Sequence, residues 1–280
     1  MQEVLINIGI SVFAPSIEAI AITTSKAYAK RFMHKNKILT PKFQVLEKPL
    51  MAFDYIKSVD LPQVIRPDNH SFQECSLFCE TKAQAQKIID NFFASGNKKI
   101  VIEDYIEGKN VSFWTLTDGY NAKIIGTSAK YQNNIAQFEP DFLTNEIREK
   151  INNEIIMPTI QALNLEDEEY VGILGFDIIL SKENEAYLIG YNSFFDDINI
   201  DFFVDAYDFN WAEVFESTLI GDVFSKFNFD IANKKFMYSI RENEEINFIS
   251  TKTKANLNLM LNELIADKKE FLEAQKIWKS

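Results

Sequence analysis

The chain has 280 residues, of which 46% are hydrophobic and 25% are charged. This length and composition exclude a disordered or disulfide-dependent miniprotein and predict two lobes with a small appendage. The formal net charge of −12 opposes binding to nucleic acids and to anionic membranes, so the expected partners are a small-molecule ligand or another protein.

The first 22 residues open with an isoleucine-rich stretch, and we expect them to be a remnant of an N-terminal domain. They contain no basic segment followed by an apolar signal core, and no later apolar run approaches the about 20 residues that cross a bilayer. The two cysteines, Cys75 and Cys79, favour reduced thiols over a secreted disulfide framework. These features predict a soluble, cytoplasmic protein.

Local signals predict three helices and three strands in the first part of the chain. A first helix should end near Lys35, and its candidate caps are Thr23, Thr24 and Ser25. Thr81 should cap a second helix over 82–95, whose apolar residues recur on one helix face. A shorter helix is expected at 50–58, with strands at 43–46, 64–65 and 99–103.

The second part of the chain alternates hairpins with helices. One hairpin is expected from 111–117 and 122–127 around Asp118-Gly119, and another from 171–180 and 185–191. A long helix over 146–163 should bend near Pro158. The remaining predicted elements are a helix over 211–224, strands at 236–240 and 246–249, and a final helix over 254–279.

This mixture of helices and hairpins gives an α+β fold class. We expect residues 43–107 to form a small lid, and residues 23–42 together with 108–225 to form a larger lobe built on a sheet. Residues 226–280 are expected to form a reduced C-terminal domain.

Three pairs of segments carry a family resemblance. In order along the chain they are residues 12–19 with 25–33, residues 101–108 with 111–119, and residues 154–160 with 172–175. In order and spacing, residues 22–200 resemble the phosphoribosylamine–glycine ligase (glycinamide ribonucleotide synthetase) family of ATP-grasp proteins. The resemblance implies an ATP-grasp fold, with a small lid subdomain and a larger mixed-sheet lobe.

The resemblance also implies where a nucleotide would bind. Lys26 would approach the ATP phosphates, and Arg66 stands where the family has a lysine before its phosphate loop. The hinge that would hold adenine through its main chain comprises Glu103, Asp104, Tyr105 and Ile106. The residues alone support a hinge, because a strand running into Tyr105 and Ile106 offers free main-chain donors and acceptors beside apolar walls. The alternative is an edge strand that turns into a hairpin.

The chain departs from the family at its phosphate and substrate loops. Residues 66–75 contain no glycine, although glycine relieves the turns that let backbone amides surround a phosphate. Glu74 stands in place of the loop lysine and would repel a triphosphate, and Phe194 replaces an arginine. The family's glycine-rich substrate loop has no counterpart over 131–140. These departures predict that binding of the cofactors ATP and magnesium is weak or lost.

The implied metal site is altered as well. Gly190-Tyr191-Asn192 replaces the family's Glu-x-Asn, so one carboxylate is missing. A shifted magnesium site would use Asp177, Asn192 and Asp197, because hard cations prefer oxygen ligands. The alternative is that these are solvated polar residues around a bend.

Three functions follow from this pattern, and none assigns a catalytic residue. The first is a degenerate ATP-grasp protein, a pseudoenzyme retained for binding or structure, because the loops and side chains that stabilise transition-state charge are changed together. The second is an active ATP-dependent carboxylate–amine ligase of the purine-biosynthesis type, working through an acyl phosphate in a rebuilt site. The third is a regulatory subunit that binds a small anion or a protein partner.

Overall fold

The computed structural model describes residues 12–68, 76–130, 135–140, 142–166, 168–193, 207, 209–229, 236–242 and 245–251. Several sequence predictions lie partly or wholly outside these residues: the first eleven residues of the remnant predicted over 1–22, Glu74 and Cys75, the segment 131–134, Phe194 and Asp197, and the final helix over 254–279. The described elements are helices combined with antiparallel sheets, so the α+β class is confirmed. No described helix has the length and apolar character that a membrane span requires.

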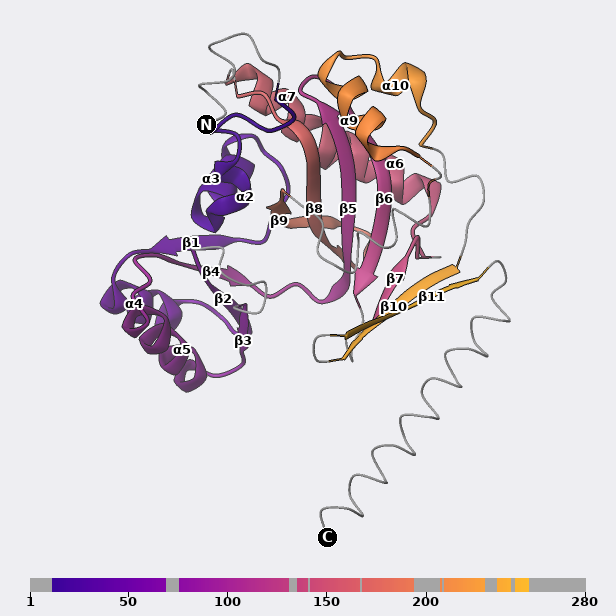
Figure 1. The fold of residues 1–280 in the computed structure, drawn as a ribbon. Coiled ribbons are helices and arrows are strands. Elements are labelled where there is room, and N and C mark those ends of the chain that lie inside the picture. Colours follow the sequence, from indigo (N-terminus) through magenta and orange to yellow (C-terminus); the bar gives the residue numbers. More distant parts are fainter. Residues whose placement is uncertain are drawn as a thin grey trace, which may run out of the picture.

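The smaller sheet has four antiparallel strands in the order β1-β4-β2-β3. These strands are β1 (Phe43–Leu46), β4 (Ile100–Asp104), β2 (Gln63–Pro67) and β3 (Leu77–Cys79). Helices α4 (Pro49–Ser58) and α5 (Lys82–Ala94) pack together on one face of this sheet (Figure 1). The core beneath them includes Ile56, Ile65, Ile89 and Ile102, all buried. All of these elements fall within 43–107, the range predicted for the lid.

Helix α5 shows how local sequence sets an element boundary. Thr81 Oγ1 accepts a hydrogen bond from the Gln84 amide at 3.2 Å, and Gln84 Oε1 accepts one from the Thr81 amide at 3.1 Å. This capping box satisfies two backbone donors that a helix start would leave unpaired. Ala85 and Ile89 are fully buried one turn apart, so the predicted cap and apolar stripe are both confirmed.

The larger sheet has seven antiparallel strands in the order β11-β10-β7-β6-β5-β8-β9. Their bounds are β5 (Gly108–Asp118), β6 (Ala122–Lys130), β7 (Ile135–Phe138), β8 (Val171–Ser181), β9 (Ala186–Asn192), β10 (Phe236–Glu242) and β11 (Glu245–Thr251). Both predicted hairpins are present as β5–β6 and β8–β9. Because β10 pairs with β7, the two late strands extend this sheet and do not form a sheet of their own.

One face of the larger sheet carries α2 (Ala21–Thr24), α3 (Lys26–Lys35), α6 (Asn145–Ile151) and α7 (Met157–Leu165). The interruption predicted near Pro158 is a π-helical turn over Asn152–Ile156, between α6 and α7. Proline has no amide to donate within a helix, so the regular α-helical hydrogen bonding is interrupted just before Pro158. Figure 1 places α2 and α3 between the two sheets.

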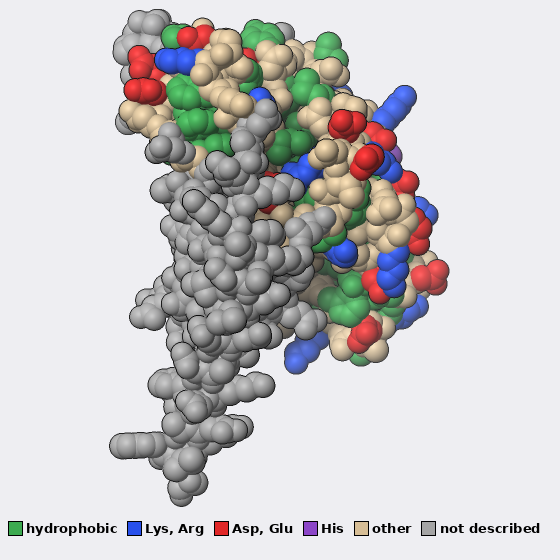
Figure 2. Space-filling model, turned by 90° about the vertical axis from the view of Figure 1, so that its right-hand side faces the viewer, with side chains coloured by type: hydrophobic (Ala, Val, Ile, Leu, Met, Phe, Trp, Pro, Cys, Tyr) green, Lys and Arg blue, Asp and Glu red, His purple; other side chains and the backbone are tan. Residues whose placement is uncertain are grey.

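The opposite face carries α9 (Trp211–Leu219) and α10 (Val223–Lys226). The prediction of one helix over 211–224 is wrong, because α9 ends in a Schellman motif: Asp222 N–H donates to Ser217 O at 3.1 Å, and Gly221 N–H donates to Thr218 O at 3.2 Å. Gly221 has φ of 79°, a conformation that glycine adopts without strain. Figure 2 shows hydrophobic side chains gathered in the upper part of this side of the molecule, at the height of α9 and α10.

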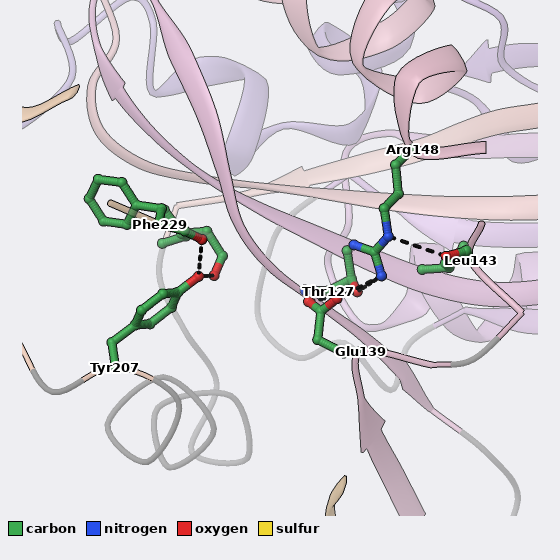
Figure 3. A network of polar contacts seen from close by, with 7 residues as sticks. Thr127, Glu139, Leu143, Arg148, Tyr207 and Phe229 are labelled. Atoms are coloured by element: carbon green, nitrogen blue, oxygen red, sulfur yellow. Dashed lines mark hydrogen bonds and ion pairs between the residues drawn. The ribbon is translucent and has the colours of Figure 1, made fainter. Parts of the chain in front are cut away.

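Two polar networks are anchored on β6, an interior strand of the larger sheet (Figure 3). The Tyr207 hydroxyl lies 2.5 Å from Ile125 O and 3.0 Å from Phe229 O, which ties the α9–α10 side to β6. On the α6 side, Arg148 donates to Glu139 Oε2 at 2.6 Å, and Glu139 Oε1 accepts from the Thr127 amide at 2.8 Å. Both networks satisfy buried polar groups, so they fix strand positions without unpaired charge.

Two glycines on neighbouring strands offer a matched test of the packing. A Cβ on Gly175 would lie 2.6 Å from Cζ3 of the buried Trp114, whereas a Cβ on Gly190 would meet nothing within 4 Å. We therefore expect Gly175→Ala to lower the free energy of unfolding by about 1–3 kcal/mol, as overpacked cores do. Gly190→Ala should be neutral or slightly stabilising. Urea denaturation of both variants measures the difference, and equal effects would contradict this account of the Trp114 contact.

Candidate functional site

A cavity of about 260 Å³ lies where the two sheets and α2–α3 meet. Ile22, Lys26 and Ala29 line it from α2 and α3, and Arg66 and Ser76 line it from the smaller sheet and its loop. The rest of the lining comes from three neighbouring strands of the larger sheet: Asn110, Val111, Ser112 and Trp114 on β5, Asp177, Ile178 and Ile179 on β8, and Ile189, Gly190, Tyr191 and Asn192 on β9. Four residues predicted from the sequence, Lys26, Arg66, Asp177 and Asn192, therefore share one cavity.

The start of α3 is tied to the strand end after β2. Asp68 Oδ1 accepts hydrogen bonds from Ser25 Oγ and from the Ala27 amide, both at 2.8 Å, and Asp68 O accepts one from the Lys26 amide at 3.3 Å. Ser25 Oγ also caps the helix by accepting from the Tyr28 amide at 3.1 Å. Of the three predicted caps, Ser25 is the one used. These bonds hold Lys26 at the cavity wall.

Behind this wall lies a buried ion triad. Glu103 is 1% exposed, and its Oε2 lies 2.6 Å from Lys30 Nζ, whose side chain is 2% exposed. The Glu103 Oε1 atom forms an ion pair with Nε of Arg66. Lys30 Nζ also donates to Thr40 Oγ1 at 2.7 Å. One carboxylate on β4 thus links a lysine on α3 to an arginine on β2.

The triad perturbs the proton affinities of its members. Burial lowers the pKa of Lys30, and the Glu103 carboxylate opposes that shift. Burial alone would raise the pKa of Glu103, but the cations of Lys30 and Arg66 reverse this and hold the pKa of that carboxyl below its usual value. Glu103 therefore carries a negative charge at neutral pH and lies between the cations of Lys30 and Arg66.

The opposite wall carries the carboxylate of Asp177. Its Oδ1 accepts from Ser112 Oγ at 2.7 Å, and its Oδ2 accepts from Asn192 Nδ2 at 2.6 Å. Gly190 lies directly across from Asp177 in the β8–β9 register. Among the described residues that line the cavity, Asp177 is the one acidic side chain, and both of its oxygens already accept hydrogen bonds.

The described part of this wall supplies one acidic side chain, Asp177, and magnesium in proteins is usually held by one or two carboxylates together with substrate phosphates. Within the described part of the chain, no group of three His, Cys, Asp or Glu side chains is arranged to hold a metal ion. Asp197, the third predicted ligand, lies outside the described residues. The proposed set of Asp177, Asn192 and Asp197 stays a prediction.

The predicted adenine hinge, Glu103 to Ile106, is not among the described residues that line the cavity. The Tyr105 amide donates to Pro62 O at 3.4 Å, so the prediction that this main-chain donor is free is wrong. Asp104 is likewise engaged, since its Oδ1 accepts from Gln63 Nε2 at 2.8 Å. The Tyr105 side chain is 43% exposed and meets the Phe78 ring edge-on at 4.8 Å. Adenine binding at this hinge stays a prediction.

Sequence reasoning missed Lys30, Asp68 and Ser112. Lys30 carried a usable signal, because it lies three residues from both Ala27 and Met33, on the buried side of α3. A lysine on such a face requires a buried carboxylate partner. Asp68 and Ser112 carried no such signal, since their partners come from distant segments of the chain.

Comparison with known proteins gives a consistent result. A family model described as the ATP-grasp (A) domain of phosphoribosylglycinamide synthetase matches residues 24–200. Phosphoribosylamine–glycine ligase of Neisseria meningitidis serogroup B is 27% identical over 206 residues, which cover 68% of this chain and 49% of that protein. The Clostridium acetobutylicum ligase is 26% identical over 201 residues, covering 66% and 48%. The chain spans about half the length of these curated relatives.

Solved structures show the same fold. The phosphoribosylamine–glycine ligase of Thermotoga maritima matches with a TM-score of 0.71 at 22% identity, covering 82% of this chain and 61% of that one. An L-amino acid ligase of Bacillus licheniformis matches with a TM-score of 0.72 at 12% identity, covering 95% and 75%. At these identities the likeness establishes the fold alone, which is the ATP-grasp fold expected from the sequence.

The triad gives a prediction about stability and pH. Because the native pKa of Glu103 lies below its unfolded value of about 4.3, Glu103 stabilises the fold above that pH. This contribution is lost as the pH falls through the lower native value. We expect Glu103→Gln to lower the free energy of unfolding by about 3 kcal/mol at pH 7, and the deficit to shrink below about pH 4.

Urea denaturation of wild type and variant across this pH range measures the deficit. Glu107→Gln is the control. Glu107 is 68% exposed in its pair with Lys182, so this substitution should change the free energy of unfolding by at most about 0.5 kcal/mol. A Glu103→Gln deficit that does not change with pH would contradict the assigned charge.

Proposed function

The chain belongs to the phosphoribosylglycinamide synthetase ATP-grasp domain family, and we propose that it binds a phosphorylated ligand such as ATP weakly, without carrying out ligation. In this proposal the protein is a degenerate member that acts in binding or structure. The observation that supports it is the unequal number of positive and negative side chains in the described lining of the cavity. Lys26 and Arg66 face a single described carboxylate, Asp177, whose oxygens are both hydrogen-bonded.

The cationic wall supports binding of phosphates. Lys26 begins α3, where the positive end of the helix dipole adds to its own charge. Arg66 presents a planar group with several donors, which suits phosphate oxygens. Apolar lining residues such as Ile22 and Ile178 provide a surface for the uncharged part of a ligand.

The acidic wall argues against phosphoryl transfer. Transfer of a γ-phosphate depends on cations that bridge its oxygens and neutralise the charge that develops. Carboxylates hold such cations, and here the position opposite Asp177 is a glycine. In its described lining, the same cavity can therefore attract phosphates while it offers one carboxylate, Asp177, to hold a bridging ion.

An active carboxylate–amine ligase is the second candidate, because Lys26, Arg66, Asp177 and Asn192 do share one cavity. In that reaction the γ-phosphate of ATP passes to a carboxylate, giving ADP and an acyl phosphate. An amine then attacks the acyl carbon and releases phosphate as the amide forms. The relatives' names suggest glycine as the acid and phosphoribosylamine as the amine.

Thermal melting separates the two candidates. We expect millimolar ATP to raise the melting temperature equally with and without magnesium, because the binding groups are Lys26 and Arg66. Lys26→Ala should abolish the shift, whereas Lys87→Ala, on an exposed position of α5, should keep it. No ADP should form when glycine and phosphoribosylamine are added. A magnesium-dependent shift lost in Asp177→Ala, together with ADP formation, would establish the ligase.

Restoring the missing carboxylate gives a second prediction. A Cβ at Gly190 meets nothing within 4 Å, and Gly190 lies opposite Asp177, so a glutamate side chain has room there. We expect Gly190→Glu to gain a melting-temperature increase with millimolar magnesium that the wild type lacks. Gly190→Gln, equal in size but uncharged, is the control. If magnesium raises the melting temperature of Gly190→Glu no more than that of Gly190→Gln, the glycine is not the reason for weak metal binding.

A further inference from the structure

Lys30 is a buried lysine that the proposed function does not yet use. It is 1% exposed and does not belong to the described lining of the cavity. Its ammonium group is nevertheless fixed on two sides, at 2.6 Å from Glu103 Oε2 and 2.7 Å from Thr40 Oγ1. Thr40 Oγ1 in turn donates to Leu188 O at 2.7 Å. These contacts compensate for the cost of moving a lysine charge from water into the protein interior.

Stability alone does not account for this arrangement. Buried ion pairs and triads are often replaced by apolar residues with no loss of stability, since the cost of desolvation offsets the attraction. The neighbours of Lys30 on α3, Ala27, Phe32 and Met33, are buried and apolar, so an apolar side chain would suit its position. The charge of Lys30 calls for another explanation.

That explanation lies in the charge balance at Arg66. Glu103 has two carboxylate oxygens, one paired with Lys30 and the other with Arg66. Without Lys30, Glu103 and Arg66 would form a neutral pair, and the cavity wall would lose a positive charge. With Lys30 present, the triad carries a net charge of +1, and Arg66 is its member that lines the cavity.

We propose that Lys30 is a positioning residue for anion binding: it neutralises Glu103 inside the protein and so leaves the charge of Arg66 to act on phosphates in the cavity. This inference rests on the proposed function, because it assumes that the cavity binds phosphates. It adds Lys30, which does not belong to the described lining of the cavity.

Calorimetric titration of the full chain with inorganic tripolyphosphate tests the inference without involving adenine or magnesium. Lys30→Met should weaken binding about tenfold, the effect of one charge that is only partly screened. Lys30→Arg should keep most of the affinity. Lys35→Met is the matched control on the same helix, where a 67% exposed lysine should change affinity less than twofold. Urea denaturation of each variant reports folding separately.

Glu103→Gln distinguishes an electrostatic role from a structural one. It removes the negative charge, so it should bind tripolyphosphate at least as tightly as the wild type, even though it is less stable. The double variant Lys30→Met with Glu103→Gln restores the net charge of +1 and should recover the affinity that Lys30→Met loses.

The outcomes are distinct. If the wild type binds tripolyphosphate but Lys30→Met binds equally well, the inference fails and the proposed function stands. It fails in the same way if the double variant stays as weak as Lys30→Met, or if affinity follows stability through the whole set. If the folded wild type does not bind tripolyphosphate, both the proposed function and the inference are overturned.

Discussion

The ion triad around Glu103 joins the parts of the molecule that form the cavity. Its carboxylate lies on β4, one partner lies on β2 of the same small sheet, and the other lies on α3, which packs against β9 of the large sheet. In a buried site, loss of one partner leaves an uncompensated charge, which costs far more than the pair contributes. The position of α3 against the smaller sheet and the charge of the cavity wall therefore depend on the same carboxylate.

This arrangement separates what holds the cavity in shape from what would perform chemistry in it. Arg66 is supported from behind by the buried Glu103, whereas the carboxylate of Asp177 is supported by Ser112 and Asn192 from the cavity side. Each carboxylate oxygen can accept a further contact, so these hydrogen bonds orient Asp177, and the described lining of the cavity offers no second acidic side chain beside it. The imbalance favours attraction of phosphates over activation of a phosphoryl group, which is the basis for placing binding ahead of ligation.

Sequence reasoning succeeded where the determinants are local. Thr81 and Gln84 are three residues apart, so the start of α5 was predictable, as was the turn after Asp118. It failed at Gly221, whose role as a helix end was readable but overlooked. The pairing of β10 with β7 and the bonds from Asp68 to α3 join distant segments, and no local pattern encodes them. The cavity was half predicted, because the resemblance supplied Lys26, Arg66, Asp177 and Asn192 but not their supporting partners.

Under the proposed function, the same separation explains how a fold of this family can persist while its chemistry changes. The residues that fill the core, such as Phe113 and Phe176, contact one another inside the protein and are fully buried. Gly190 faces the cavity, where an added Cβ meets nothing within 4 Å. A change at such a position alters which ligands bind but removes few packing contacts, so it has little effect on the stability of the fold. By contrast, a change at Lys30 or Glu103 disturbs both the fold and the charge of the cavity, because those residues belong to both.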